Sequence, residues 1–358
     1  MLQSLIKNKW IKTLVLIFLI NVCKAQHRLD SLLAYEGDIV IYTSGHSQPD
    51  LNEFILSFIF NKKTFFGDTT NVYQECNYFE SEVAKKQLHK GDSLGLFYYH
   101  TNTFNYISPS YKLELERKIK LGKVKFWGID CNFSTPTLLQ KLFDTTKLYL
   151  LSNNLNTSLL DSLSPYVDLI AGINHYAYKM EKAEVDRVER IYTFLQNTKA
   201  EVFYLDSWKP VLDFMKWVYN RGEEAFYMYA TYKRRIELDQ YRDSILFDNY
   251  WKYKKKDNVI IMGSMHSERL AYSELSIKEP SFGDYLCMES NKNSNPLRIL
   301  ITKKKVKLHA TSKEEFCGKE LFIYDLKKID TSFSMRVYSD EQINLPWSKS
   351  FDYVVQIN

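Results

Sequence analysis

Short apolar runs that end at an ionisable residue recur along this chain. They are rich in β-branched and aromatic residues, which is typical of strands buried on both faces of a parallel sheet. Four of these runs occupy residues 39–42, 71–74, 124–129 and 258–262. We predict that each is a strand, and that a further strand follows at residues 297–302.

Segments with helical periodicity lie between the predicted strands in the first part of the chain. Apolar residues recur at helical spacing over residues 50–60, just after Pro49, and again over residues 79–88. An apolar strand at residues 94–99 and a helix of mixed charge at residues 111–120 come next. This alternation predicts an α/β fold with a mainly parallel sheet flanked by helices.

The pattern becomes purely helical from about residue 134 to residue 247. Its clearest periodicities lie at residues 138–143, 181–195 and 210–229, with no Gly-rich linker between them. We interpret this stretch as a helical cap inserted over the carboxyl edge of the sheet, within one domain spanning residues 26–358. Shorter strands are expected near the C-terminus, at residues 320–324, 334–337 and 353–356.

The first 25 residues have the pattern of a signal peptide. Lysines precede the apolar run 14–22, and Ala25 offers a small residue for cleavage before Gln26. The run is too short to span about 30 Å of hydrocarbon as a helix. The bulky Val22 argues against lipid attachment at Cys23. We therefore expect export to the periplasm or the medium, and no stable membrane span.

Cleavage changes the charge of the chain. It would remove four lysines and no acidic residue, which lowers the formal net charge from +5 to +1. A nucleic-acid partner is then not indicated. The lysine runs 254–256 and 303–305 are interpreted as solvated charge at a helix end and in a loop. The 26 tyrosines and 22 phenylalanines are enough for a large core and for an aromatic-lined cleft.

The cysteines show no metal-binding pattern. The four that would remain after cleavage lack the paired CxxC spacing of a zinc site. Cys76 and Cys131 directly follow Glu75 and Asp130, so a disulfide between them is one interpretation in an exported protein. Two small buried residues beneath a site are the favoured interpretation.

Four ionisable residues mark the ends of the predicted strands: His46, Glu75, Asp130 and His266. Open α/β sheets bind their ligands outside the carboxyl ends of their strands. We therefore treat the four residues as one candidate site for a small-molecule substrate.

Several segments, in order, resemble the erythromycin esterase family. Residues 43–46 line up with its Glu-x-x-His motif, and Glu75 with the glutamate that closes its next strand. Residues 125–130 match its aromatic-Gly-aromatic-Asp strand. Residues 242–251 resemble its Arg-Asp-x-x-Met-x-Glu-Asn helix, and residues 282–286 its Gly-containing segment. The resemblance covers most of the chain from the first strand to the fifth, apart from the helical middle.

This resemblance implies a hydrolase in which His46 is the general base on water that attacks an ester or lactone carbonyl. An imidazole with an unperturbed pKa of about 6.5 accepts a proton at neutral pH, and Glu75 would fix its tautomer. His266 would join them. Arg242 would hold a carboxylate or polarise an oxyanion, the alternative being an ordinary Arg–Asp pair on a helix surface.

Two positions depart from the family pattern. Thr43 replaces the glutamate of the first motif, and Gly263 replaces the first histidine of a His-x-x-His strand exit. A catalytically degenerate ligand-binding protein is therefore one alternative. Another comes from the Gly-x-x-His that ends at His266, which resembles that of TraB/Tiki-type metalloproteases. His46, Glu75 and His266 would then hold a divalent metal; the esterase mechanism itself requires no cofactor.

The remaining candidates are weaker. Asp130 and His175 are assigned to substrate binding, His175 from the cap, although a structural histidine is the favoured alternative there. His89, His100 and His309 are interpreted as surface or strand-end residues. The chain has no Gly-x-Ser-x-Gly elbow, P-loop or dinucleotide fingerprint. The antibiotic in the family name does not define the substrate.

Overall fold

The computed structural model describes most of the chain beyond the predicted signal peptide. The described residues are 28–43, 48–89, 104, 106–131, 136–167, 181–221, 232–263, 280–290, 296–303, 313–316, 319–328, 332–336, 342–346 and 350–358. The predicted strand at residues 94–99 lies outside them, as does the predicted signal peptide. No helix among the described residues is long and apolar enough to cross a membrane.

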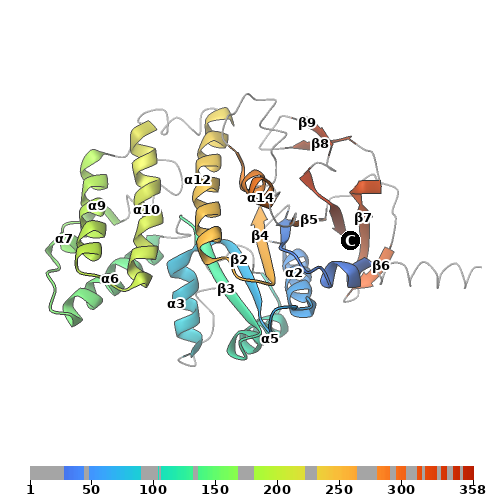
Figure 1. The fold of residues 1–358 in the computed structure, drawn as a ribbon, viewed down its shortest axis with the longest axis horizontal. Coiled ribbons are helices and arrows are strands. Elements are labelled where there is room, and N and C mark those ends of the chain that lie inside the picture. The colour runs from blue at the N-terminus through green and yellow to red at the C-terminus, as the bar shows by residue number, and fades with distance from the viewer. Residues whose placement is uncertain are drawn as a thin grey trace, which may run out of the picture.

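A mainly parallel sheet forms the centre of the molecule (Figure 1). Its strand order is β3-β2-β4-β1-β5-β10-β7-β6. The strands from β3 to β10 in this order are parallel, whereas β7 and β6 are joined by antiparallel pairing. Their bounds are β1 Ile39–Thr43, β2 Thr70–Asn77, β3 Val124–Asp130, β4 Asn258–Gly263, β5 Leu297–Thr302, β6 Lys313–Phe316, β7 Lys319–Asp325 and β10 Tyr353–Ile357. The predicted α/β fold is confirmed.

The predicted helices are present, with different ends. They are α2 Pro49–Asn61, α3 Tyr78–His89, α5 Pro109–Lys120, α6 Pro136–Ser152, α7 Ser158–Asp161, α9 Lys182–Asn197, α10 Val202–Arg221, α12 Tyr232–Tyr253 and α14 Phe282–Ser290. The predicted start of α10 at Pro210 is wrong, because the helix begins at Val202 and contains that proline. Tyr204 and Trp208 are buried in the turns before it, and their packing offsets the cost of a helix-interior proline.

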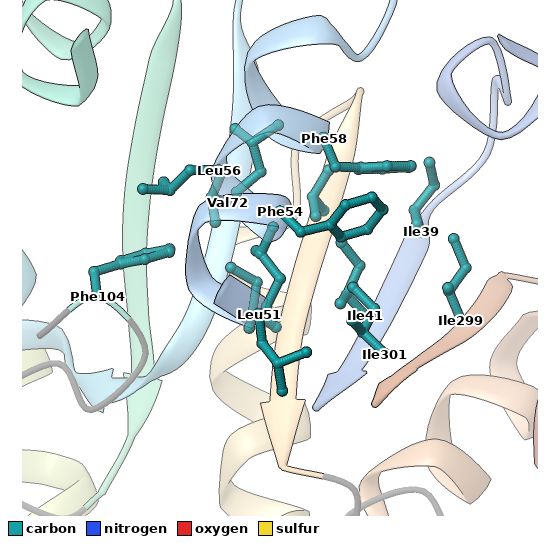
Figure 2. Close-up of a cluster of buried hydrophobic side chains, with 14 of the residues drawn as sticks. Ile39, Ile41, Leu51, Phe54, Leu56, Phe58, Val72, Phe104, Ile299 and Ile301 are labelled. Atoms are coloured by element: carbon teal, nitrogen blue, oxygen red, sulfur yellow. The ribbon is translucent and has the colours of Figure 1, made fainter. Parts of the chain in front are cut away.

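Each face of the sheet has its own layer of helices. Figure 2 shows Phe54 and Phe58 of α2 packed over Ile39 and Ile41 of β1 and the neighbouring β5. Helices α12 and α14 cover the other face of the sheet. The side chains of β1 and β4 that point to this face alternate along each strand with those that point to the first face. Burial on both faces explains why these strands read as continuous apolar runs.

The long helical segment between β3 and β4 has a core of its own. Figure 1 shows α6, α7, α9 and α10 gathered on one side of the molecule, with α12 between them and the sheet. Trp208 is fully buried in this core and donates a hydrogen bond to Thr146 Oγ1 at 3.0 Å. Phe79 and Cys131, which follow the ends of β2 and β3, belong to the same core. The inserted helices therefore meet the sheet at the carboxyl ends of these two strands.

The C-terminal strands divide between two sheets. The predicted strands at residues 320–324 and 353–356 became β7 and β10 of the main sheet. The one predicted at residues 334–337 corresponds to β8 Ser332–Arg336, which pairs with β9 Gln342–Pro346 as a separate antiparallel ribbon.

Candidate functional site

The strand order brings the exits of β1 and β4 together. From β1 the chain crosses to β2 on one side, and from β4 it crosses to β5 on the other, which creates a topological switch point. Thr43 and Gly263, the last residues of β1 and β4, are directly paired in the parallel register. His46 and His266 each follow three residues later in the sequence and lie outside the described residues.

Glu75 on β2 reaches across the carboxyl edge of the sheet. Its Oε1 accepts a hydrogen bond from the backbone N–H of Gly263 at the end of β4. Its Oε2 lies 3.6 Å from a terminal nitrogen of Arg242, and only 11% of the side chain is exposed. The carboxylate therefore stands beside the exit of β4, and β4 is hydrogen-bonded to β1.

Arg242 on α12 forms an ion pair with Asp130 at the end of β3. Its Nε donates to Asp130 Oδ1 at 3.0 Å, and a terminal nitrogen contacts Oδ2. The two side chains are 14% and 3% exposed. This is the forked geometry that charge-assisted Arg–carboxylate pairs favour. Arg242 does form an Arg–Asp pair, but the pair is buried and joins two elements, so it is not an ordinary pair on a helix surface. The role of Arg242 toward a substrate stays a prediction.

The sequence of α12 explains its position across the sheet. Arg242 and Asn249 share one helix face, and Asn249 Nδ2 donates to the carbonyl oxygen of Ile129 at 2.9 Å. Asp243 and Tyr250 share the next face. Asp243 accepts the backbone N–H of Phe282 at 2.9 Å, and the Tyr250 hydroxyl bonds Asp38 Oδ2 at 2.8 Å. These contacts of residues 242–250 hold α12, which carries Arg242, against β3 and α14.

A glycine allows the ends of β2 and β3 to approach closely. A Cβ at Gly128 would lie 2.3 Å from the backbone oxygen of Asn77, a distance that side-chain carbons do not adopt. The pairing of β2 with β3 becomes irregular between Gln74 and Asn77. The N–H of Gly128 instead donates to Ser81 Oγ at 3.0 Å. This irregular exit carries Glu75, so Gly128 belongs to the architecture of the site, a role that sequence analysis did not assign.

The two cysteines beside the site, Cys76 and Cys131, are buried and are not joined by a disulfide. Burial is the main cause that raises the pKa of both thiols, with a further contribution from Glu80 for Cys76 and from Asp130 for Cys131. Such thiols stay protonated and are poor nucleophiles. The interpretation of Cys76 and Cys131 as small buried residues is therefore favoured over the disulfide.

We expect native-state alkylation to distinguish these thiols from Cys287. Cys287 is partly exposed and should react with iodoacetamide in the folded protein, whereas Cys76 and Cys131 should react only in denaturant. Peptide mapping by mass spectrometry measures each site. Labelling of Cys76 at the rate of Cys287 in the folded protein would contradict the buried assignment, and failure in denaturant without reductant would reveal a disulfide.

The other predicted site residues are only partly described. His175 lies outside the described residues, and so do two of the three candidate metal ligands. Within the described part of the chain, no group of three His, Cys, Asp or Glu residues could hold a metal ion. Asp130 is engaged by Arg242, and its assignment to substrate binding stays a prediction.

Comparison with known proteins identifies the fold. No protein-family model matches the chain, and no curated protein matches it in sequence. A succinoglycan biosynthesis protein has a similar structure, with a TM-score of 0.60, 12% identity, and coverage of 92% of this chain and 90% of that one. A Bacillus cereus protein has a TM-score of 0.54 and 13% identity over the same shares.

Erythromycin esterase EreC, solved as a mutant in an open conformation, also has a similar structure. Its TM-score is 0.49 at 12% identity, with 93% of each chain covered. These relationships are distant and concern the fold of the chain.

Proposed function

We propose that this protein is a hydrolase that opens an ester or lactone, with His46 as the general base. One observation carries the proposal: Glu75 stands between Arg242 and the end of β4, at the edge where β1 and β4 end as paired strands. The ends of β2, β3 and β4 thus each contribute a group to this edge of the sheet: Glu75, Asp130 and the backbone N–H of Gly263. A histidine at the exit of β1 would enter a site that already holds two carboxylates and a guanidinium.

These groups suit the attack of water on a carbonyl. His46 would take a proton from the attacking water, and Glu75 would orient the imidazole and stabilise the imidazolium. Glu75 would have to do this without the glutamate that the family pattern has at the position of Thr43. Arg242 keeps a positive charge at the edge, where it would stabilise the developing oxyanion. His266 would complete the site from the exit of β4.

Two alternatives make different demands on the same site. In a metal-dependent hydrolase, His46, Glu75 and His266 would be ligands, and the activity would be lost with a chelator. In a ligand-binding protein, the cluster would remain but turnover would be absent. We also propose that the protein is exported, on the basis of its N-terminal pattern, with Gln26 as the first mature residue.

A substrate screen tests the proposed activity. The purified protein is assayed against activated esters and macrolide lactones, with and without chelator. Replacement of Glu75 by Gln is expected to lower turnover by roughly 10²-fold while activity survives chelation, because an unoriented base works poorly.

Glu114→Gln is the matched control. Glu114 is a partly exposed glutamate on α5 that pairs with Arg117, outside the proposed site. Equal rates for the wild type and Glu75→Gln on every hydrolysed substrate would contradict the assignment of Glu75. Loss of all turnover with chelator would favour the metal-dependent alternative.

A further inference from the structure

Large aromatic side chains and lysines meet at the amino edge of the sheet, opposite the candidate site. Phe65 and Phe66 lie in the connection from α2 to β2, and they are 40% and 59% exposed. Lys254–Lys256 lie in the connection from α12 to β4, and all three are exposed. We refer to these five residues as the basic-aromatic patch.

A buried carboxylate joins the two halves of the patch. Asp257 is 4% exposed and has a left-handed backbone, with φ of 56°. Its two oxygens accept the backbone N–H groups of Phe65 and Phe66, each at 2.9 Å. The exposed pair is therefore held in a fixed position beside the lysines. Keeping two phenyl rings in water is unfavourable, so this arrangement is not explained by the stability of the chain alone.

The positive charge at this edge is only partly neutralised. The Lys256 amine lies 4.2 Å above the Phe66 ring, and Lys255 lies 5.6 Å above the ring of Trp127. Lys254 contacts Asp38 at 2.8 Å. Lys255 and Lys256 are exposed, and their amines lie over aromatic rings.

We propose that the basic-aromatic patch docks the protein on an anionic lipid bilayer. Aromatic side chains favour the level of the lipid headgroups, where their rings leave water. Lysines beside them gain from the negative surface potential of anionic lipids. Residues 65–68 are consecutively exposed, so the rings project outward as an insertion into a planar surface requires. Docking through this edge would leave the carboxyl edge, with Glu75, facing the solvent.

Vesicle partitioning tests this docking. The full chain is titrated with phosphatidylcholine vesicles with and without phosphatidylglycerol, and the ratio of the two partition coefficients is recorded. Comparing this ratio between variants separates the patch from the apolar run and the lysines near the N-terminus, because these are the same in every variant. The variant Lys254→Gln/Lys255→Gln/Lys256→Gln is expected to lower the ratio by about 10-fold to 100-fold. High salt should lower the ratio of the wild type in the same direction.

Phe65→Ser/Phe66→Ser should weaken binding to anionic vesicles about 10-fold or more, without lowering the melting temperature. The matched controls lie on the inserted helices, where Leu148 and Leu151 are 64% and 53% exposed. Leu148→Ser/Leu151→Ser and Lys147→Gln/Lys209→Gln/Lys216→Gln should leave both partition coefficients unchanged.

Three results would overturn the docking proposal. They are an equal partition of the wild type into neutral and anionic vesicles, a ratio unchanged in the triple lysine variant, and tighter binding of single-stranded nucleic acid than of anionic vesicles. None of them bears on the hydrolase proposal, because the patch and the candidate site lie at opposite edges of the sheet.

Discussion

Replacement of Arg242 by Met is expected to lower the free energy of unfolding by about 3–5 kcal/mol, the usual cost of removing one partner from a buried ion pair. Asp130 is 3% exposed, so its carboxylate has little access to water once the guanidinium is gone. Glu75, which is 11% exposed, would lose the same neighbour. Urea-induced unfolding followed by circular dichroism measures the change.

The exposed pair Arg117–Glu114 on α5 offers the matched control. Arg117 is 57% exposed and bonds Glu114 in the same forked manner. Because water screens such a pair, Arg117→Met should cost far less stability than Arg242→Met. Adding Asp130→Asn to Arg242→Met removes the orphaned charge and should restore part of the stability. If both arginine variants cost the same, the Arg242 cluster is hydrated and does not stabilise the fold.

The strands of this protein could be predicted because burial on both faces leaves a clear mark in the sequence. The side chains of Ile39 and Ile41 face one helical layer, and those of Val40 and Tyr42 face the other. All four positions are therefore apolar, and the strand is visible as a run. In the separate ribbon, β8 was predicted but its partner β9 was missed, because two paired strands outside the main sheet need no such continuous run.

The order of the strands could not be predicted from the same runs. β4 lies between β2 and β1, although more than 180 residues separate it from β2 in the sequence. The contact of Glu75 with Gly263 depends on this insertion, and no local pattern encodes it. Sequence analysis placed both residues at strand exits, which is a statement about each strand alone.

The role of Gly128 shows a second limit of sequence patterns. A glycine near the end of a strand is often a bulge or a point of close backbone approach, and a single sequence does not separate these cases. The structure does, because the oxygen of Asn77 occupies the space of a side chain at Gly128. Its position two residues before Asp130 was the available signal.

Replacement of His46 by Ala is expected to lower turnover of an identified ester or lactone by roughly 10²-fold to 10⁴-fold, the usual contribution of a general base. Stability should change little, since the described core of β1 ends at Thr43, three residues earlier. The pH profile gives an independent test. A general base must be neutral to accept a proton, so wild-type activity should rise with pH through a single step near the pKa of a histidine, about 6.5.

Added imidazole distinguishes a base from a structural side chain at this position. If His46 acts as the general base, free imidazole should restore part of the activity of His46→Ala, and the restored rate should grow with the concentration of neutral imidazole. His309→Ala is the control, because sequence analysis places His309 outside the candidate site. His266→Ala should weaken the same activity, and release of a bound metal by that change would support the metal-dependent alternative. A loss of several kcal/mol in stability for His46→Ala, with unchanged turnover, would identify His46 as a buried structural histidine and end the hydrolase proposal.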